Sequence, residues 1–526
     1  MKSKEVLTVL FLSCVCYTSS YKILGIFPFA APSHYFLGNE LMKGLARAGH
    51  ESTILTVFEE KKPPNDKYKQ IIMEGLYDQQ MELFGHLTNM SQNDGQQFFK
   101  NPVKAMLGFF KILIQITELT LNHTKTQQLL QDKPKYDVVI VTQFNLEALK
   151  AIAPHLGAHL VVFNNHGAGS WVNHLVGNPS LPSHVAEIIL GFSGQMDFKQ
   201  RLINTLFSLA QYVNLHVFYY PRHSELMHKY VSKDIDFDKV IYNTSLVLLN
   251  SHISLAKSGA LVPCMRDIGG FHVQPPKKLP EDLQKYLDDA KDGVIYFSMG
   301  SNVKSSTLPL ETRQALMKAF SKRKEKVLWK FEDDNMPGKP ANVKIQKWLP
   351  QSDLLAHPNI KLFITHGGFL STIETVYHGV PTVAIPVLGD QLKNARQSES
   401  DGYTKVIEMQ ELTEELLSST IEEVISNKKY RDNVKTRSKI FHDRQVKPMD
   451  DAVYWIEYIV KHNGANHLRV NYLDMAWYQY YLVDVFVVLF SVIFIVLFLI
   501  KKTVCFILGK LCKKSDKKVS NKVKKQ

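Results

Sequence analysis

The 526-residue sequence contains only five cysteines, and their positions exclude a disulfide-stabilised fold. Cys14 and Cys16 lie in an apolar N-terminal segment, and Cys505 and Cys512 follow a long apolar run near the C-terminus. Only Cys264 remains in the large middle portion, which therefore holds no intramolecular disulfide and depends on its hydrophobic core. A chain of this length exceeds one such core and suits two domains with accessory segments.

Strong positive charge is also missing from most of the chain, although the formal net charge is +13. Ten lysines and Asp516 follow Ile500, so nine of these charges belong to the C-terminal tail. The segment before Tyr21 holds one more, which leaves +3 for the middle portion. A balance of this size does not indicate nucleic-acid binding.

Two motifs of other nucleotide-using enzymes are absent. No Gly-x-Gly-x-x-Gly follows the first predicted strand, which argues against a nicotinamide-dependent oxidoreductase. No Asp-x-Asp cluster lies beside the His-Gly-Gly sequence at residues 366–368, so we predict neither a metal ion nor another bound cofactor there.

Both ends of the chain carry segments typical of a membrane protein. Residues 1–20 combine lysines, a short apolar run and small residues, which is the pattern of a cleavable signal peptide. Residues 481–500 form a nearly unbroken apolar run that is long enough to cross a bilayer once. Lysines follow this run, so the chain is expected to be single-pass type I, with residues 501–526 as a basic cytosolic tail.

The last five residues, KVKKQ, place lysines third and fifth from the end and resemble a dilysine retrieval signal for the endoplasmic reticulum. Attraction of a short basic tail to anionic lipid headgroups is compatible with this interpretation. The sequons at Asn89, Asn122 and Asn243 would be accessible to glycosylation in the lumen.

Apolar runs that alternate with helical patterns predict two doubly wound α/β domains, each with a parallel sheet between helices. The first, residues 21–270, has predicted strands at YKILGIFPF, STILTVF, YDVVIV, HLVVF and SLVLLN. A linker at 271–290 leads to the second, residues 291–450, with strands at GVIYFSMGS, VLWKF, VKIQKW, KLFITH and TVAIP. Residues 451–480 are assigned to a returning helix and a juxtamembrane segment.

Polar and aromatic side chains follow the strands of the second domain. Ligands of such sheets bind beyond the carboxyl ends of the strands, so we expect Ser301, Trp348, Gln351, His366 and Asp390 to share one cleft. The helix that starts after the His-Gly-Gly sequence offers backbone amides and a dipole to a phosphate group.

Three segments together carry a family resemblance: WLPQSDLLAHP at 348–358, THGGFLSTIETVYHGVP at 365–381 and PVLGDQ at 386–391. This spacing resembles the signature of the UDP-glycosyltransferases, specifically the membrane-bound, insect-like animal type. The resemblance extends over essentially the whole chain. It implies the two-domain GT-B fold, metal-independent catalysis, a UDP-sugar in the C-terminal domain and a role in detoxification.

The resemblance also assigns roles to residues. Trp348 and Gln351 would contact uracil and ribose, and Glu374 would bind the ribose hydroxyls. Ser301, His366, Gly368 and Ser371 would hold the diphosphate. Asp390 and Gln391 would hold the sugar. Leu370 departs from mammalian relatives, which often carry Asn there, and we expect little loss because Ser371 lies beside it.

On the acceptor side, His34 lies at a strand–helix junction and matches the family's catalytic base. The family usually supports this histidine with an acid at the end of the strand YDVVIVT, where this chain has Thr142. Glu147 lies nearby, either as a substitute or as an exposed helix residue, and the exposed position is favoured slightly. Residues 35–230 should form the acceptor pocket, and His166, Trp171 and His174 either line it or form a satisfied loop.

The reaction expected from the resemblance is inverting transfer of a hexose from a UDP-sugar to a hydroxyl of a small lipophilic alcohol or phenol. UDP-glucose is favoured over UDP-glucuronate because Asp390 is an awkward neighbour for a sugar carboxylate. The alternative, motivated by Thr142, is a weakly active or non-catalytic protein that binds UDP-sugar or a hydrophobic ligand. Self-association through the membrane segment is compatible with the sequence.

Overall fold

The computed structural model describes residues 20–93, 102–255, 259–301 and 303–523. Of the predicted signal peptide, only Ser20 is among the described residues. Of the two lysines in the dilysine pattern, Lys522 is described and Lys524 is not. The described chain separates into a folded unit that ends at Arg469 and a C-terminal unit that starts at Val470. Each is described by itself below.

The folded unit contains two parallel sheets, as the sequence predicted. The first has the order β3-β2-β1-β4-β5-β6-β7, and the second has the order β10-β9-β8-β11-β12-β13. Every recorded strand pairing is parallel. In sequence, the first-sheet strands are β1 (Lys22–Phe27), β2 (Glu51–Thr56), β3 (Tyr68–Ile72), β4 (Val138–Thr142), β5 (His159–Asn164), β6 (Leu246–Leu249) and β7 (Met265–Asp267). The second-sheet strands are β8 (Val294–Ser298), β9 (Lys326–Lys330), β10 (Val343–Gln346), β11 (Ile360–Thr365), β12 (Thr382–Ala384) and β13 (Thr404–Val406).

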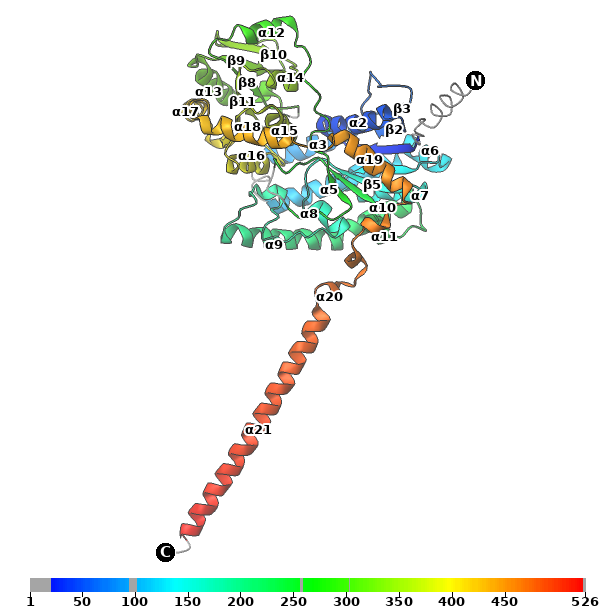
Figure 1. Ribbon diagram of the computed structural model, residues 1–526, viewed down its shortest axis with the longest axis vertical. Helices are drawn as coiled ribbons and strands as arrows, with labels where there is room; N and C mark the ends of the chain where they lie inside the picture. The colour runs from blue at the N-terminus through cyan, green and yellow to red at the C-terminus, as the bar shows by residue number, and fades with distance from the viewer. Residues whose placement is uncertain (1–19, 94–101, 256–258, 302, 524–526) are drawn as a thin grey trace, which may run out of the picture. The chain divides into compact units, whose positions relative to one another are not determined.

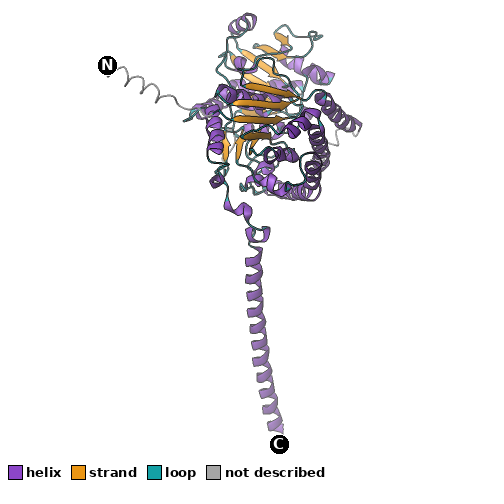
Figure 2. Cartoon of the chain, turned by 90° about the vertical axis from the view of Figure 1, so that its right-hand side faces the viewer, coloured by secondary structure: helices purple, strands orange, loops and turns teal. Residues whose placement is uncertain are grey.

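Helices cover both sheets (Figures 1 and 2). Those of the first half are α2 (Pro32–Arg47), α3 (Leu76–Asn93), α5 (Pro102–Asn122), α6 (Thr124–Asp132), α7 (Ile152–His155), α8 (Ser170–Asn173), α9 (Phe198–Asn214), α10 (Tyr220–Tyr230) and α11 (Phe237–Tyr242). Those of the second half are α12 (Glu281–Asp288), α13 (Leu310–Ser321), α14 (Gln351–Leu355), α15 (Phe369–His378), α16 (Gln391–Ser400), α17 (Glu414–Ser426), α18 (Lys428–His442) and α19 (Pro448–Lys461).

The central strands are nearly continuous apolar runs because helices bury both of their faces. β4 and β8 are buried at every position. The strand order reverses between β1 and β4 in the first sheet and between β8 and β11 in the second. A crevice forms where neighbouring connections leave in opposite directions, so these two points are where ligands are expected.

Helix α19 carries the chain from the second half back onto the first, where it contacts α2, β5 and β6. The contact is close: a Cβ added at Gly44 of α2 would lie 2.1 Å from Sδ of Met449 in α19. A larger residue there would displace the Met449 side chain, so α19 packs closely against α2 and joins the C-terminal part of the unit to its N-terminal half.

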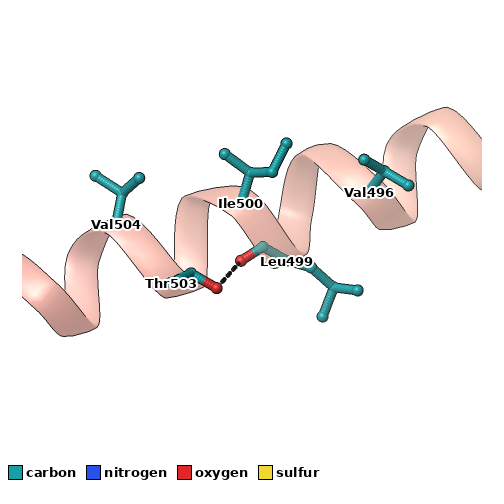
Figure 3. Close-up of a pocket in the computed structure, with 5 residues that line it drawn as sticks. All are labelled: Val496, Leu499, Ile500, Thr503 and Val504. Atoms are coloured by element: carbon teal, nitrogen blue, oxygen red, sulfur yellow. Dashed lines mark hydrogen bonds between the residues drawn. The ribbon is translucent and has the colours of Figure 1, made fainter.

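The C-terminal unit contains α20 (Trp477–Tyr480) and α21 (Val483–Val523). Within α21, Val483–Leu511 is the one stretch of the described chain long and apolar enough to cross a membrane, with a mean hydropathy of 3.2. The helix starts two residues later than the predicted span because Leu482 adopts a left-handed φ of 55°. Figure 3 shows apolar side chains along α21, with Thr503 donating to the Leu499 carbonyl oxygen at 2.8 Å. This bond satisfies the hydroxyl within the helix itself.

Candidate active site

His34 lies in the first turn of α2, just beyond the carboxyl end of β1. Its ring contacts those of Phe29 and Phe144, with centroid distances of 5.1 and 4.6 Å. Its Nε2 atom is buried and has no hydrogen-bond partner among the described residues. Burial lowers the pKa of His34 to about 3, with a smaller lowering from His166 and an opposing effect of Asp390. The imidazole is therefore neutral at physiological pH, which is the form a general base requires.

Thr142 ends β4, beside β1 at the point where the strand order reverses. Its hydroxyl is buried without a hydrogen-bond partner among the described residues. Position 142 itself therefore supplies no carboxylate to His34.

The favoured prediction that Glu147 is an exposed helix residue is wrong. Glu147 and Lys150 each expose only 1% of their side chains and form a buried ion pair. Gln143 donates to the other carboxylate oxygen at 3.0 Å. Because the Lys150 ammonium lowers the pKa of Glu147 against the cost of burial, this carboxylate is already neutralised by a neighbour and is a structural group.

The loop after β5 was predicted to line the acceptor pocket or to be a satisfied loop, and all three of its named residues form hydrogen bonds. His174 is fully bonded, through the Ser170 carbonyl oxygen at 2.8 Å and the Tyr220 hydroxyl at 2.6 Å. Trp171 donates to Asn164 at 3.2 Å. His166 instead reaches the second half of the unit, where its Nε2 lies 3.1 Å from Oδ2 of Asp390.

On the donor side, the His366 ring packs between the backbones of Gly300 and Gly368. A Cβ at Gly368 would lie 2.3 Å from His366 Nε2, and one at Gly300 would lie 2.5 Å from His366 Cε1. Burial lowers the pKa of His366 to about 4, so the ring is neutral. Its Nδ1 is buried without a partner among the described residues. Ser301 lies exposed next to Gly300, and Gly368 caps the N-terminus of α15.

A second group of predicted donor residues forms a hydrogen-bonded cluster. Gln351, at the start of α14, donates to Ser371 at 3.0 Å and to Glu374 at 2.5 Å. Tyr296 of β8 donates to the side-chain oxygen of Gln351 at 3.2 Å. Burial raises the pKa of Glu374 to about 7. Trp348, just before α14, leaves 71% of its surface exposed and thus presents a free flat face.

The last predicted pair lies at the start of α16. Asp390 accepts hydrogen bonds from His166 and from Asn394, and these bonds lower its pKa to about 2 despite burial. Gln391 is buried, and its side-chain oxygen accepts from the amides of Val387 and Leu388 at 2.8 and 3.0 Å. Gln391 therefore shapes the loop that precedes α16.

Sequence reasoning did not name Asn394, which also donates to the Gly367 carbonyl oxygen at 3.2 Å and so joins α16 to the His-Gly-Gly turn. Its position four residues after Asp390 in a predicted helix is the signal that could have found it. His166 was considered only for the acceptor pocket, and no sequence signal relates it to Asp390.

Two doubly wound parallel sheets in one folded unit, with His34 after β1 of the first and the His-Gly-Gly turn before α15 of the second, are the architecture of the GT-B class of glycosyltransferases. Solved structures agree in fold: the calicheamicin glycosyltransferase CalG4 aligns with a TM-score of 0.59 at 17% identity, covering 84% of this chain and 98% of its own. The glycosyltransferase of kitacinnamycin aligns with a TM-score of 0.57 at 15% identity, covering 84% of this chain and 99% of its own.

The family model for UDP-glucoronosyl and UDP-glucosyl transferases matches residues 23–518, so the chain belongs to that family. It is 35% identical to UDP-glucosyltransferase 2 of Dactylopius coccus over 98% of this chain and 96% of that protein. It is 29% identical to UDP-glucuronosyltransferase 2B14 of Oryctolagus cuniculus, over 90% of this chain and 91% of that protein. Transfer of a sugar from a UDP-sugar is therefore its activity.

Proposed function

We propose that the protein transfers glucose from UDP-glucose to a hydroxyl of a small lipophilic alcohol or phenol, with inversion at the anomeric carbon. His34 acts as the general base. It removes the acceptor proton while the acceptor oxygen attacks and the bond between the anomeric carbon and UDP breaks. A single displacement of this kind converts an α-linked donor into a β-glycoside.

The observation that supports the proposal is the proximity of His34 to His166 and Asp390, which are hydrogen-bonded to each other between the two halves of the unit. Asp390 and His166 are close enough to His34 to influence its pKa. Gly368 at the start of α15 and the unpaired Nδ1 of His366 suit the leaving diphosphate. Trp348, Gln351 and Glu374 suit uracil and ribose, and Ser301 and Ser371 suit the diphosphate oxygens.

Glucose is favoured as the sugar because of the charge at Asp390. Its two hydrogen bonds keep this carboxylate ionised, and an ionised carboxylate repels the carboxylate of glucuronate. The 35% identical relative is named a glucosyltransferase, which agrees with this choice. Glucuronate remains the second candidate donor because other relatives are named glucuronosyltransferases.

We further propose that α21 anchors the protein once in the endoplasmic reticulum membrane, with the folded unit lumenal and the basic tail cytosolic. Asn122 and Asn243 are exposed at the surface of the folded unit and suit lumenal glycosylation, and Asn89 is the third acceptor. Digestion with a glycan-removing amidase should lower the apparent mass of the full chain on a gel. In Asn122→Gln this decrease should be smaller by the mass of one glycan.

The test of the reaction is UDP release by the detergent-solubilised full chain with UDP-glucose or UDP-glucuronate and a panel of phenols and sterols. We expect acceptor-dependent release with UDP-glucose, unchanged by a metal chelator and lost in His34→Ala. Tight binding of UDP-glucose with no turnover across the panel would instead support the non-catalytic alternative.

A further inference from the structure

The Nδ1 atom of His34 has only a weak hydrogen-bond partner. It lies 3.4 Å from the Ser33 hydroxyl, the one partner of this atom among the described residues. That distance is longer than a typical hydrogen bond, and a neutral hydroxyl stabilises a cation much less than a carboxylate does. With a proton on Nδ1, the buried and unpaired Nε2 keeps its lone pair for an acceptor hydroxyl. This tautomer gives His34 a free lone pair but little support for the imidazolium that forms when Nε2 takes a proton.

Asp390 does not replace the carboxylate that position 142 lacks. Among the groups that shift the pKa of His34 it is the one carboxylate, and its effect is smaller than the opposing effects of burial and of His166. Asp390 also accepts hydrogen bonds from His166 and Asn394. The pKa of His34 stays at about 3, whereas a general base works best with a pKa near the working pH. His34 is therefore a weak base.

A weak base restricts the hydroxyls that it can deprotonate. The hydroxyl of a phenol has a pKa of about 10, as in tyrosine, whereas that of an aliphatic alcohol is about 16, close to that of water. Proton transfer in the transition state follows part of this difference. The missing support of His34 therefore slows transfer to an aliphatic alcohol much more than transfer to a phenol.

Four phenylalanines beside His34 form what we call the aromatic wall: Phe29, Phe84, Phe109 and Phe144. Phe29 and Phe144 contact the imidazole itself, with ring centroids 5.1 and 4.6 Å away. Phe84 of α3 contacts Phe29 at 5.6 Å, and Phe109 of α5 contacts Phe144 at 5.7 Å. Phe84, Phe109 and Phe144 are only half-buried, which leaves part of each ring exposed.

The aromatic wall suits an acceptor whose ring carries the reacting oxygen. Aromatic rings prefer offset or edge contacts with one another at centroid distances of about 4.5–7 Å. When a phenol oxygen lies at Nε2 of His34, its ring is one bond away and reaches Phe29 or Phe144. The wall and the weak base thus favour the same class of acceptor.

We propose that the chain transfers sugar to phenolic hydroxyls in preference to aliphatic alcohols, and that Thr142 in place of an acid sets this preference. The inference rests on the proposed transfer reaction. The O–H bond of the phenol breaks and its proton goes to Nε2 of His34. The phenol oxygen bonds to the anomeric carbon, and the bond between that carbon and UDP breaks, so that UDP leaves as an anion.

The first test compares 4-methylphenol with benzyl alcohol, which are isomers and therefore match in size. The detergent-solubilised full chain is given saturating UDP-glucose, and each glucoside is measured by chromatography. We expect kcat/KM to be at least about 100-fold higher for 4-methylphenol. Similar values for the two isomers would overturn the inference and leave the transfer reaction standing, whereas absence of product with every acceptor would overturn both.

Substitutions at Thr142 test the cause of the preference. Thr142→Asp supplies a carboxylate, so the ratio of the two kcat/KM values should fall at least about tenfold, mainly through faster transfer to benzyl alcohol. Thr142→Val has the same shape as the natural residue without a charge, and the ratio should stay within about twofold. A ratio unchanged by Thr142→Asp would overturn the role of Thr142.

A series of phenols tests the same point without a change at Thr142. At pH 6.5, 4-methoxyphenol, phenol, 4-chlorophenol and 3-nitrophenol are mostly neutral and increasingly acidic. Because His34 is weak, kcat should rise along this series by about threefold or more. A kcat that is constant or falls along the series would overturn the inference.

Phe109→Leu tests the aromatic wall separately. It should raise KM for 4-methylphenol at least about threefold and leave KM for UDP-glucose unchanged. Phe58→Leu is the matched control, because Phe58 is also half-buried but its ring contacts Tyr35 and Tyr77 instead of the wall. Equal changes in both variants would exclude the wall as the acceptor site.

Discussion

At the level of single residues, the surroundings of His34 decide which form of its imidazole is present. Two aromatic rings and a buried, unpaired Nε2 keep it neutral, with a pKa of about 3. The neutral ring can accept a proton, but no carboxylate stabilises the resulting cation from the position of Thr142. Such a carboxylate beside a catalytic histidine is worth up to about 10⁴-fold in rate in the serine proteases.

Thr142→Asp should therefore raise kcat by about tenfold or more. The new carboxylate would raise the pKa of His34, so a fall in rate at low pH should appear closer to neutrality than in the natural protein. The matched control is Thr142→Val, which keeps the shape and removes a hydroxyl that has no hydrogen-bond partner in the described part of the chain. Its kcat should stay within about twofold. The measurement is the pH dependence of kcat at saturating donor. A faster Thr142→Val variant, or a Thr142→Asp variant with unchanged rate, would contradict this account.

Glu374 predicts a pH dependence of nucleotide binding. Its pKa is raised from 4.5 to about 7, so the folded protein holds this proton up to near-neutral pH. If the ionised form accepts the ribose hydroxyls, UDP affinity should fall up to about tenfold between pH 8 and pH 6. Calorimetric titration of the Glu374→Gln variant should show weaker binding with most of this difference removed. An equal pH dependence in both proteins would exclude Glu374 as its source.

The same shift has a consequence for stability. The group binds more protons in the folded than in the unfolded state between about pH 4.5 and 7, so its contribution lowers the free energy of unfolding as pH rises through this window. The destabilisation is complete above pH 7. In Glu374→Gln this contribution should be absent, as melting temperatures across the window would reveal.

The local sequence could predict the contacts and burial of some of these residues but not of others. Ser371 and Glu374 share a helix face at a spacing of three, and the structure indeed joins both to Gln351. The environment of Glu147 was not predictable in this way. Lys150 lies three residues later, but nothing in the local sequence indicates that helices and strands bury both side chains completely.

At the scale of elements, the turn between β11 and α15 depends on two close backbone approaches to His366. Gly368→Ala would place its Cβ 2.3 Å from His366 Nε2, although the φ of Gly368, −62°, suits any residue. We expect a loss of about 1–3 kcal/mol in the free energy of unfolding from overpacking, with UDP affinity reduced at least tenfold.

Gly194→Ala, in the loop before α9, provides the matched control, since its added Cβ would lie 3.9 Å from the His184 carbonyl oxygen, an ordinary van der Waals distance. The φ of Gly194 is not left-handed and alanine reduces the conformational entropy of the unfolded chain, so this variant should be neutral or more stable by up to about 1 kcal/mol. Chemical denaturation with calorimetric UDP titration measures both effects. Unchanged stability and affinity in Gly368→Ala would show that the turn relaxes without cost.

The central strands could be predicted because a buried parallel strand is a continuous apolar run. β3, β7 and β13 were not predicted, since each lies at a sheet edge, and β7 and β13 have only three residues. Edge strands with a polar face, such as β3 with its pattern YKQII, lack that signal.

At the scale of the whole folded unit, polar contacts join the two halves. His166 bonds Asp390, and Lys393 donates to the Ala186 carbonyl oxygen. These partners are 224 and 207 residues apart in sequence, so no local pattern relates them. The fold class was predictable from repeated local signals, whereas contacts between the domains were not.

His166→Ala should separate sugar binding from nucleotide binding. Asp390 loses one of its two partners, and a hydrogen bond to a charged group is worth about 1.5–3 kcal/mol, so KM for UDP-glucose should rise about tenfold or more. Affinity for UDP alone should be unchanged, because Trp348, Gln351 and Glu374 lie in the second half alone. Steady-state kinetics with UDP titration provide the comparison. An equal loss in UDP affinity would indicate general disturbance of the cleft.

The most direct test of the central claim is the anomeric configuration of the product formed by the full chain from UDP-glucose and a phenol. Proton NMR of the purified glycoside reports it through the coupling between the first two sugar protons. A single displacement with His34 as base predicts a β-glucoside, formed by the natural protein and absent in His34→Ala. An α-glucoside, or β-glucoside formed equally well by His34→Ala, would contradict the mechanism.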